Sequence, residues 1–183
     1  MDLSTSSVQY ASSTGTTWSR TNLSGTLQPG QYYLVQQAAG TNTAAAALPT
    51  PDATGSIALS GTAGKVALVS SQVTLAGACP GAADGVLDLV GFGTATTCSE
   101  AAPTANLGNA IAALRKANGC TDSGNNSADF DLAAPAPRNT AVAAAPCSGT
   151  AIPVLTIADA AIEEGDATGS TLRFSVTLSA PAP

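Results

Sequence analysis

The sequence predicts an all-β fold, and three observations carry this prediction. Short segments of strand-like composition recur between turn signals, a spacing typical of β-sandwiches and barrels. The one helix-like segment, residues 109–117, is short. Four cysteines occur in a chain of 183 residues whose 44% apolar content consists mostly of small side chains and includes 38 alanines. Because small side chains bury little area, such a core would benefit from covalent crosslinks.

Turn signals bound the predicted strands. Leu27-Gln28-Pro29-Gly30 combines a proline and a glycine in the positions that favour a tight turn, and Gly61–Gly64 predicts the loop of a hairpin between its two flanking strands. Prolines in residues 40–54 exclude a strand interior there, which predicts an exposed loop. The segments predicted as strands are 7–10, 31–36, 56–59, 65–69 and 86–90.

Residues 109–117 carry conflicting signals. Asn109 is a candidate N-cap, Ile111 and Leu114 are three residues apart, and Gly119 is a candidate stop, so local propensity favours a helix. The surrounding run of strands instead favours a short strand.

The sequence pattern changes after Cys147. Residues 154–157 and 172–178 are strong strand candidates, separated by the acidic turn Glu163-Glu164-Gly165-Asp166. Two strands cannot bury a sheet face alone. We therefore expect a main domain over 1–147, a linker over 148–153, and an incomplete two-stranded arm over 154–183.

The cysteine spacing favours disulfides over a metal or redox site. Intervals of 19, 22 and 27 residues include no close Cys-x-x-Cys pair. Of the three connectivities, Cys79–Cys98 with Cys120–Cys147 closes local loops, each worth about 3 kcal/mol; a Cys98–Cys120 bond would contradict it. Disulfides indicate export. No apolar run approaches the roughly 18 residues of a membrane span, and a secretion signal is expected upstream of this chain.

The composition excludes common catalytic arrangements. There is no histidine, so Ser-His-Asp and Cys-His arrangements cannot be assembled. We therefore expect this chain not to be an enzyme. We expect no cofactor, and calcium is the one candidate ligand ion.

The calcium candidate is the loop that contains Asp122, Asn125 and Asp129. Its oxygen ligands are spaced as in a tight cation-binding turn, but a bidentate glutamate is missing at its end. Asx-rich turns are common for structural reasons, because these side chains bond their own backbone. The structural interpretation is favoured about four to one.

Arg115 and Lys116, with Arg138 and Lys65, form the one candidate nucleic-acid patch. The net charge of −6 opposes such binding on average. An ion pair between Arg115 and a nearby carboxylate, such as Asp129, is the favoured alternative.

Three aromatic residues, Trp18, Tyr32 and Tyr33, are candidates for a ligand-facing strip. Adjacent residues of one strand point to opposite faces, so at least one of the two tyrosines is expected in the core.

Several motifs, taken together, resemble the lamin tail domain of bacterial secreted endonuclease/exonuclease/phosphatase-type proteins. The resemblance runs from about residue 2 to 147. The motifs are Asp2-Leu3-Ser4 with Val8-Gln9-Tyr10, the segments 23–35, 64–69, 90–93, 114–122 and 125–130, and Ala134-Pro135-Ala136-Pro137-Arg138-Asn139.

This resemblance implies an immunoglobulin-like β-sandwich that serves as a non-catalytic appendage beside a separate catalytic domain. Two departures from the family pattern are visible. The family's first strand, before Asp2, is missing, so the domain is expected to be N-terminally truncated. Thr5-Ser6 replaces a Gly-Trp pair.

Residues 153–180 resemble the start of a Calx-beta domain, through Leu155-Thr156-Ile157, Glu163-Glu164-Gly165 and the strand 174–179. The leading hypothesis is an accessory module of a secreted nuclease or phosphatase, whose partner is the catalytic domain of the same parent chain. The alternative is a modular cell-surface or adhesion protein with calcium-binding Calx-beta repeats, whose partner is a protein or cell-surface ligand. Direct DNA binding is a weaker third hypothesis.

Overall fold

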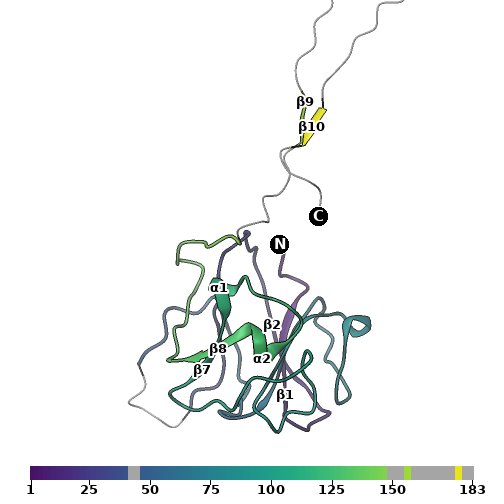
Figure 1. Cartoon of the computed structure of the whole chain (residues 1–183), viewed down its shortest axis with the longest axis vertical. Helices are drawn as coiled ribbons and strands as arrows, with labels where there is room; N and C mark the ends of the chain where they lie inside the picture. The colour runs from purple at the N-terminus through teal and green to yellow at the C-terminus, as the bar shows by residue number, and fades with distance from the viewer. Residues whose placement is uncertain (41–45, 148–154, 158–175, 179–183) are drawn as a thin grey trace, which may run out of the picture. The chain divides into compact units, whose positions relative to one another are not determined.

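A computed structural model describes residues 1–40 and 46–147, and the backbone of 155–157 and 176–178. The chain separates into two compact units, Met1–Pro146 and Cys147–Pro183, and each is described by itself (Figure 1). Strands dominate the described residues, so the fold is all-β. This confirms the predicted class at that level.

A four-stranded antiparallel sheet forms the centre of the first unit. Its order is β2-β1-β5-β6, with β1 at Ser7–Ser12, β2 at Ser19–Asn22, β5 at Gly64–Val69 and β6 at Val86–Phe92. Three of these four strands coincide with predicted segments. The fourth strand, β2, was not predicted from the sequence.

Short elements surround this sheet. Two small sheets pair β3 with β4 in parallel and β7 with β8 antiparallel. The bounds are β3 Val35–Gln36, β4 Ala53–Thr54, η1 Ala82–Asp84, β7 Ala112–Arg115, α1 Lys116–Gly119, α2 Asn126–Asp129 and β8 Phe130–Ala133.

Two strand predictions were wrong. Only Val35–Gln36 of the segment 31–36 is a strand, and residues 56–59 are not one. Gly61–Gly64 is therefore not a hairpin loop. The physical reason is that β5 already pairs with β1 on one side and β6 on the other, which leaves no edge for 56–59. Residues 109–117 contain the strand β7. The surrounding run of strands therefore indicated their structure better than their local helix propensity did.

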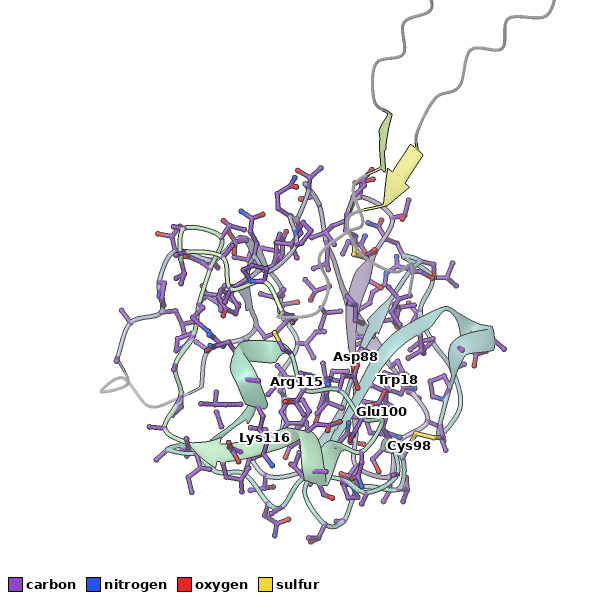
Figure 2. All side chains as sticks on the ribbon, turned by 45° about the horizontal axis from the view of Figure 1, so that its top comes forward. Trp18, Asp88, Cys98, Glu100, Arg115 and Lys116 are labelled. Atoms are coloured by element: carbon purple, nitrogen blue, oxygen red, sulfur yellow. A yellow bond between two sulfur atoms is a disulfide. The ribbon has the colours of Figure 1, made fainter. Side chains whose placement is uncertain are left out.

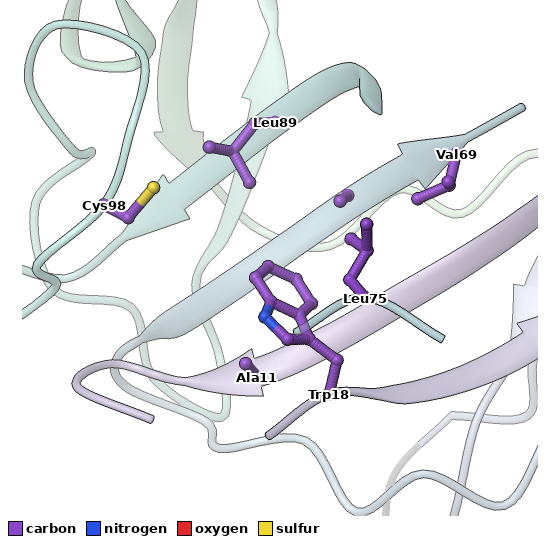
Figure 3. Close-up of a cluster of buried hydrophobic side chains, with 7 residues drawn as sticks. Ala11, Trp18, Val69, Leu75, Leu89 and Cys98 are labelled. Atoms are coloured by element: carbon purple, nitrogen blue, oxygen red, sulfur yellow. The ribbon is translucent and has the colours of Figure 1, made fainter. Parts of the chain in front are cut away.

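One face of the sheet, here called face A, carries the side chains of Ser7, Gln9, Ala11, Lys65, Ala67, Val69 and Leu89. The register places these residues opposite one another, because alternate residues of a strand share a face. Trp18, Leu75 and Cys98 complete the apolar cluster with Ala11, Ala67, Val69 and Leu89, and Figure 3 shows it packed against the strands.

Lys65 is fully buried on face A. Its ammonium donates to the carbonyls of Gly15 and Ala78, both at 2.7 Å, and lies 5.5 Å from the ring centre of Trp18. Burial lowers the pKa of the Lys65 amine below its usual value. Trp18 in turn donates its indole N–H to the Gly77 carbonyl at 3.0 Å. The lysine and the tryptophan thus tie two loops to one end of the sheet.

Gln9 performs a similar task at the other end of face A. Its amide nitrogen donates to the Val73 carbonyl at 2.8 Å, and its amide oxygen accepts from the Leu75 N–H at 2.8 Å. Because a fully buried amide without partners would be costly, these bonds hold the 71–75 segment over face A.

The opposite face, face B, carries Val8, Tyr10, Val66, Leu68, Asp88, Val90 and Phe92. Tyr10 and Phe92 pack against Gly64, where an added Cβ would approach their rings to 2.6 and 2.8 Å, so this position requires glycine. A cavity of about 440 Å³ opens between Val66, Val90, Ile111 and Phe130. Face B is therefore less completely filled.

The Cys79–Cys98 disulfide is present, with a Cα–Cα distance of 5.3 Å, as the sequence favoured. Cys120 and Cys147 are also disulfide-bonded, and no cysteine of the described part of the chain is a free thiol. Cys98 belongs to the face A cluster, so its crosslink closes the same end of the sheet that Lys65 ties.

In the second unit, β9 (Leu155–Ile157) pairs antiparallel with β10 (Val176–Leu178). Both lie within predicted strands. The acidic turn 163–166 and the rest of 158–175 lie outside the described residues. Within the described residues, none of the helices has the length and apolar character needed to cross a membrane.

Candidate functional site

The connection between β7 and β8 gathers most of the residues that the sequence singled out. It runs through α1 and α2 and contains Arg115, Lys116 and the turn from Asp122 to Asp129. Antiparallel pairing of Ala112–Arg115 with Phe130–Ala133 brings its two ends together.

Arg115 anchors this connection to face B. Its guanidinium lies 2.6 Å from Asp88 and 3.3 Å from Asp122, and it packs 4.7 Å from the ring centre of Phe130 (Figure 2). It also donates to the Thr121 carbonyl at 3.2 Å. Arg115 therefore does pair with carboxylates, as predicted, but Asp129 is not one of them. The actual partner, Asp88, comes from β6, 27 residues away in sequence.

Asp129 stabilises its own turn instead. Its carboxylate accepts from the Ser123 hydroxyl at 2.6 Å, the Ser123 N–H at 2.9 Å and the Asn125 N–H at 3.2 Å. These bonds, the Ser123 hydroxyl first, hold the pKa of the Asp129 carboxyl below its usual value. Asn125 caps α2 by accepting from the Ser127 N–H.

The calcium hypothesis gains no support from this arrangement. Asp122, Asn125 and Asp129 lie in one turn, but Asp129 is engaged by the turn and Asp122 lies beside Arg115. No cluster of three or more metal-binding side chains occurs among the described residues. Oxygens that already accept N–H bonds are poorly placed to bind a cation.

Asn126 closes the outer edge of β6. Its amide oxygen accepts from the Gly91 N–H at 2.8 Å, and its amide nitrogen donates to the Leu89 carbonyl at 3.0 Å. A single side chain thus supplies the pair of bonds that a further strand would make at this edge. The same nitrogen lies 2.9 Å from the Glu100 carboxylate.

Glu100 is the carboxylate most affected by this crowding. Burial, and then the negative charge of Asp88, raise the pKa of the Glu100 carboxyl above its usual value. A hydrogen bond from the Leu89 backbone and the proximity of Arg115 only partly offset this increase in pKa.

Three basic residues line one cavity of about 370 Å³, here called the basic pocket. They are Arg115, Lys116 and Arg138, and the wall also contains Asn118 and Asp131. The structure therefore brings together three of the four members of the predicted basic patch. Lys65 does not belong to it, because that side chain is buried on face A.

Arg138 is held in a defined position within the basic pocket. Its guanidinium stacks 3.8 Å from the ring centre of Tyr32 and donates to the side-chain oxygen of Asn118 at 3.3 Å. Tyr32 also donates its hydroxyl to the Asn118 carbonyl at 3.3 Å. Tyr32 is thus a platform for a cation.

The expected aromatic strip is not formed. Trp18 is buried on face A, whereas Tyr32 and Tyr33 are both partly exposed, so the expectation that one of the tyrosines is a core residue was wrong. They precede β3 and do not belong to a strand, so the alternation rule does not apply to them.

The role of Asn118 was missed by sequence reasoning. Ala117, Asn118 and Gly119 all have positive φ angles, of 50°, 59° and 103°. The Asn118-Gly119 dipeptide was an available signal, because both residue types tolerate this conformation. Ala117 does so at a cost of roughly 1–2 kcal/mol.

No protein-family model matches the chain, and no curated protein or solved structure shows significant similarity to it.

Proposed function

We propose that this chain is a non-catalytic accessory module of an exported multidomain protein, of the lamin-tail type that its motifs resemble. In this proposal the central sheet and the small β3–β4 and β7–β8 sheets belong to an immunoglobulin-like sandwich. The neighbouring catalytic domain is a nuclease or phosphatase, and residues 154–183 begin a Calx-beta domain.

The observation that carries the proposal is the disulfide state of all four cysteines. Disulfides persist in oxidising compartments, and small extracellular modules use them where the core gains little from each side chain. The Cys79–Cys98 bond lies at the end of the sheet where Lys65 and Trp18 also fix the loops. This design favours a durable scaffold.

The absence of histidine from the sequence also supports a non-catalytic role, because it removes the usual general base. Three carboxylates of the candidate site are engaged structurally: Asp88 and Asp122 by Arg115, and Asp129 by Ser123 and backbone N–H groups. The module would therefore contribute position or binding, and its neighbour would contribute the reaction.

The test uses the parent protein and this chain side by side. We expect the chain alone to hydrolyse neither DNA nor a phosphate monoester in the presence of Mg²⁺ or Ca²⁺. We expect the parent protein without the module to keep its turnover number but to lose retention on its substrate or cell surface. A parent chain that contains only further Calx-beta repeats would support the adhesion alternative, and turnover by the isolated chain would overturn the proposal.

A further inference from the structure

The basic pocket concentrates positive charge in an acidic protein. It is lined by three of the six lysine and arginine residues of a chain whose net charge is −6. An even distribution of the few cations would not produce this. Because like charges repel, such a cluster requires either internal partners or an external anion.

Among the described residues, internal carboxylates pair with Arg115 and Lys116 but not with Arg138. Arg115 is largely buried and lies within 3.3 Å of both Asp88 and Asp122. Lys116 donates to the Ala128 carbonyl and is 3.7 Å from Asp131, whose side chain is 71% exposed. Arg138 makes one hydrogen bond within the described residues, to Asn118, and has no carboxylate partner there. Most of its N–H groups remain available.

Arg138 is also preorganised. The stack on Tyr32 and the bond to Asn118 fix the plane of the guanidinium, so little side-chain entropy is lost when a ligand binds. The backbone of Ala117 and Asn118 adopts left-handed angles at this wall of the pocket. Strained backbone of this kind is concentrated at ligand-binding sites.

We propose that the basic pocket binds a phosphate or sulfate monoester of a small polyol. The guanidinium of Arg138 and the ammonium of Lys116 approach the anion as separate donors, an arrangement that suits a tetrahedral oxyanion. The volume of about 370 Å³ lies at the lower end for ligand pockets, which favours a small molecule over a polymer.

The remaining wall accounts for the organic part of the ligand. Leu114, Ala133 and Ala136 supply apolar surface, and Asp131 supplies an exposed acceptor for a hydroxyl group. Asp131 would repel a free anion, but it can bind a hydroxyl of a polyol. The pocket therefore favours an ester over inorganic phosphate.

Calorimetric titration of the full chain with glucose 6-phosphate, glucose 6-sulfate and inorganic phosphate tests the proposal. We expect at least one ester to bind more tightly than inorganic phosphate. Arg138→Gln should weaken ester binding about 10-fold or more, because a charge-assisted bond is lost. Lys116→Gln should weaken it several-fold. The matched control is Arg20→Gln, which removes the same charge from an exposed position on β2 and should leave affinity unchanged.

Asp131→Ala separates the ester from the free anion. This substitution should weaken binding of the sugar ester and strengthen binding of inorganic phosphate. The proposal is overturned if the wild-type chain binds neither ester, if Arg20→Gln weakens binding as much as Arg138→Gln, or if duplex DNA binds more tightly than both esters with a salt dependence that indicates several phosphate contacts. Thermal melting of each variant confirms that a loss of binding is not a loss of folding.

Discussion

The two faces of the central sheet are built differently. On face A, Ala67 and Val69 are completely inaccessible to solvent, and polar side chains such as Lys65 and Gln9 are buried with their hydrogen bonds satisfied. On face B, Val66 and Val90 border a cavity of about 440 Å³ and remain partly accessible. The same strands thus present a closed surface and an incompletely filled one.

The difference follows from what covers each face. Segments bonded to buried side chains cover face A, and the Cys79–Cys98 disulfide closes one end. Face B is approached by the short β7–β8 sheet, whose main polar anchor is the Arg115–Asp88 ion pair. Face A is therefore the more rigid side of the sheet. On face B the side chains are less tightly packed, and the β7–β8 sheet that approaches this face also lines the basic pocket.

Replacement of Lys65 by methionine should have the largest effect. It keeps most of the side-chain volume but leaves the buried carbonyls of Gly15 and Ala78 without their donor. We expect a loss of about 3 kcal/mol in the free energy of unfolding, measured by urea denaturation. Lys116→Met, at the partly exposed start of α1, should cost less than about 0.5 kcal/mol. Equal effects of the two substitutions would remove the basis for treating face A as the rigid side.

Val66 and Val69 of β5 provide a matched comparison, because Val69 lies on face A and Val66 on face B. Val69→Ala should cost about 2 kcal/mol, because it opens a void in a filled region, whereas Val66→Ala should cost about 1 kcal/mol, because it enlarges a space that is already open. The difference between their chemical denaturation midpoints is the measurement. A larger loss for Val66→Ala would reverse the proposed order of packing.

Replacement of an alanine by a larger residue should lower the free energy of unfolding on face A and raise it on face B. Ala67→Val adds volume to a fully buried position on face A and should cost about 1.5 kcal/mol through overpacking. Ala113→Val adds the same volume at the wall of the face B cavity and should stabilise the protein by about 0.5 kcal/mol. Thermal melting distinguishes these outcomes, and stabilisation by Ala67→Val would show that face A contains unused space.

The sequence predicted the central strands of this fold because their signal is local. In β5, Lys65, Ala67 and Val69 alternate with Val66 and Leu68, but Lys65 was assigned to the basic patch and its burial was not predicted. The segment 56–59 has a similar local signal but is not a strand. Its failure reflects competition for the edges of β5, a tertiary property that no local pattern contains.

The candidate site was predictable as a set of residues but not as a geometry. Arg115, Lys116 and Arg138 line one cavity, whereas nucleic-acid binding by this patch stays a prediction. The partner of Arg115 was missed because Asp88 belongs to a distant strand. The stack of Arg138 on Tyr32 joins residues separated by more than half of the first unit, so spacing gave no indication of it.

The smallest predicted change in stability concerns Glu100, which lies near the edge of β6 beside Asn126. Glu100 has its pKa raised by burial and by the nearby Asp88. Between its unfolded pKa, near 4.5, and this higher native value, the native state binds more protons than the unfolded state. The contribution of Glu100 to stability is therefore fully present below that range and is lost as the pH rises through the native pKa.

Glu100→Gln should remove this loss while keeping an acceptor for the Asn126 amide. We expect the variant to be more stable than the wild type at pH 7 by less than about 1 kcal/mol, and the difference to vanish near pH 4. Urea denaturation across pH 4–8 measures both, and Asp131→Asn controls for the change in net charge. A variant less stable than the wild type at pH 7 would mean that the charged bond to Asn126 outweighs the burial and repulsion of Glu100. In that case the hydrogen bond between Glu100 and Asn126 would stabilise the edge of β6, as the buried polar bonds stabilise face A.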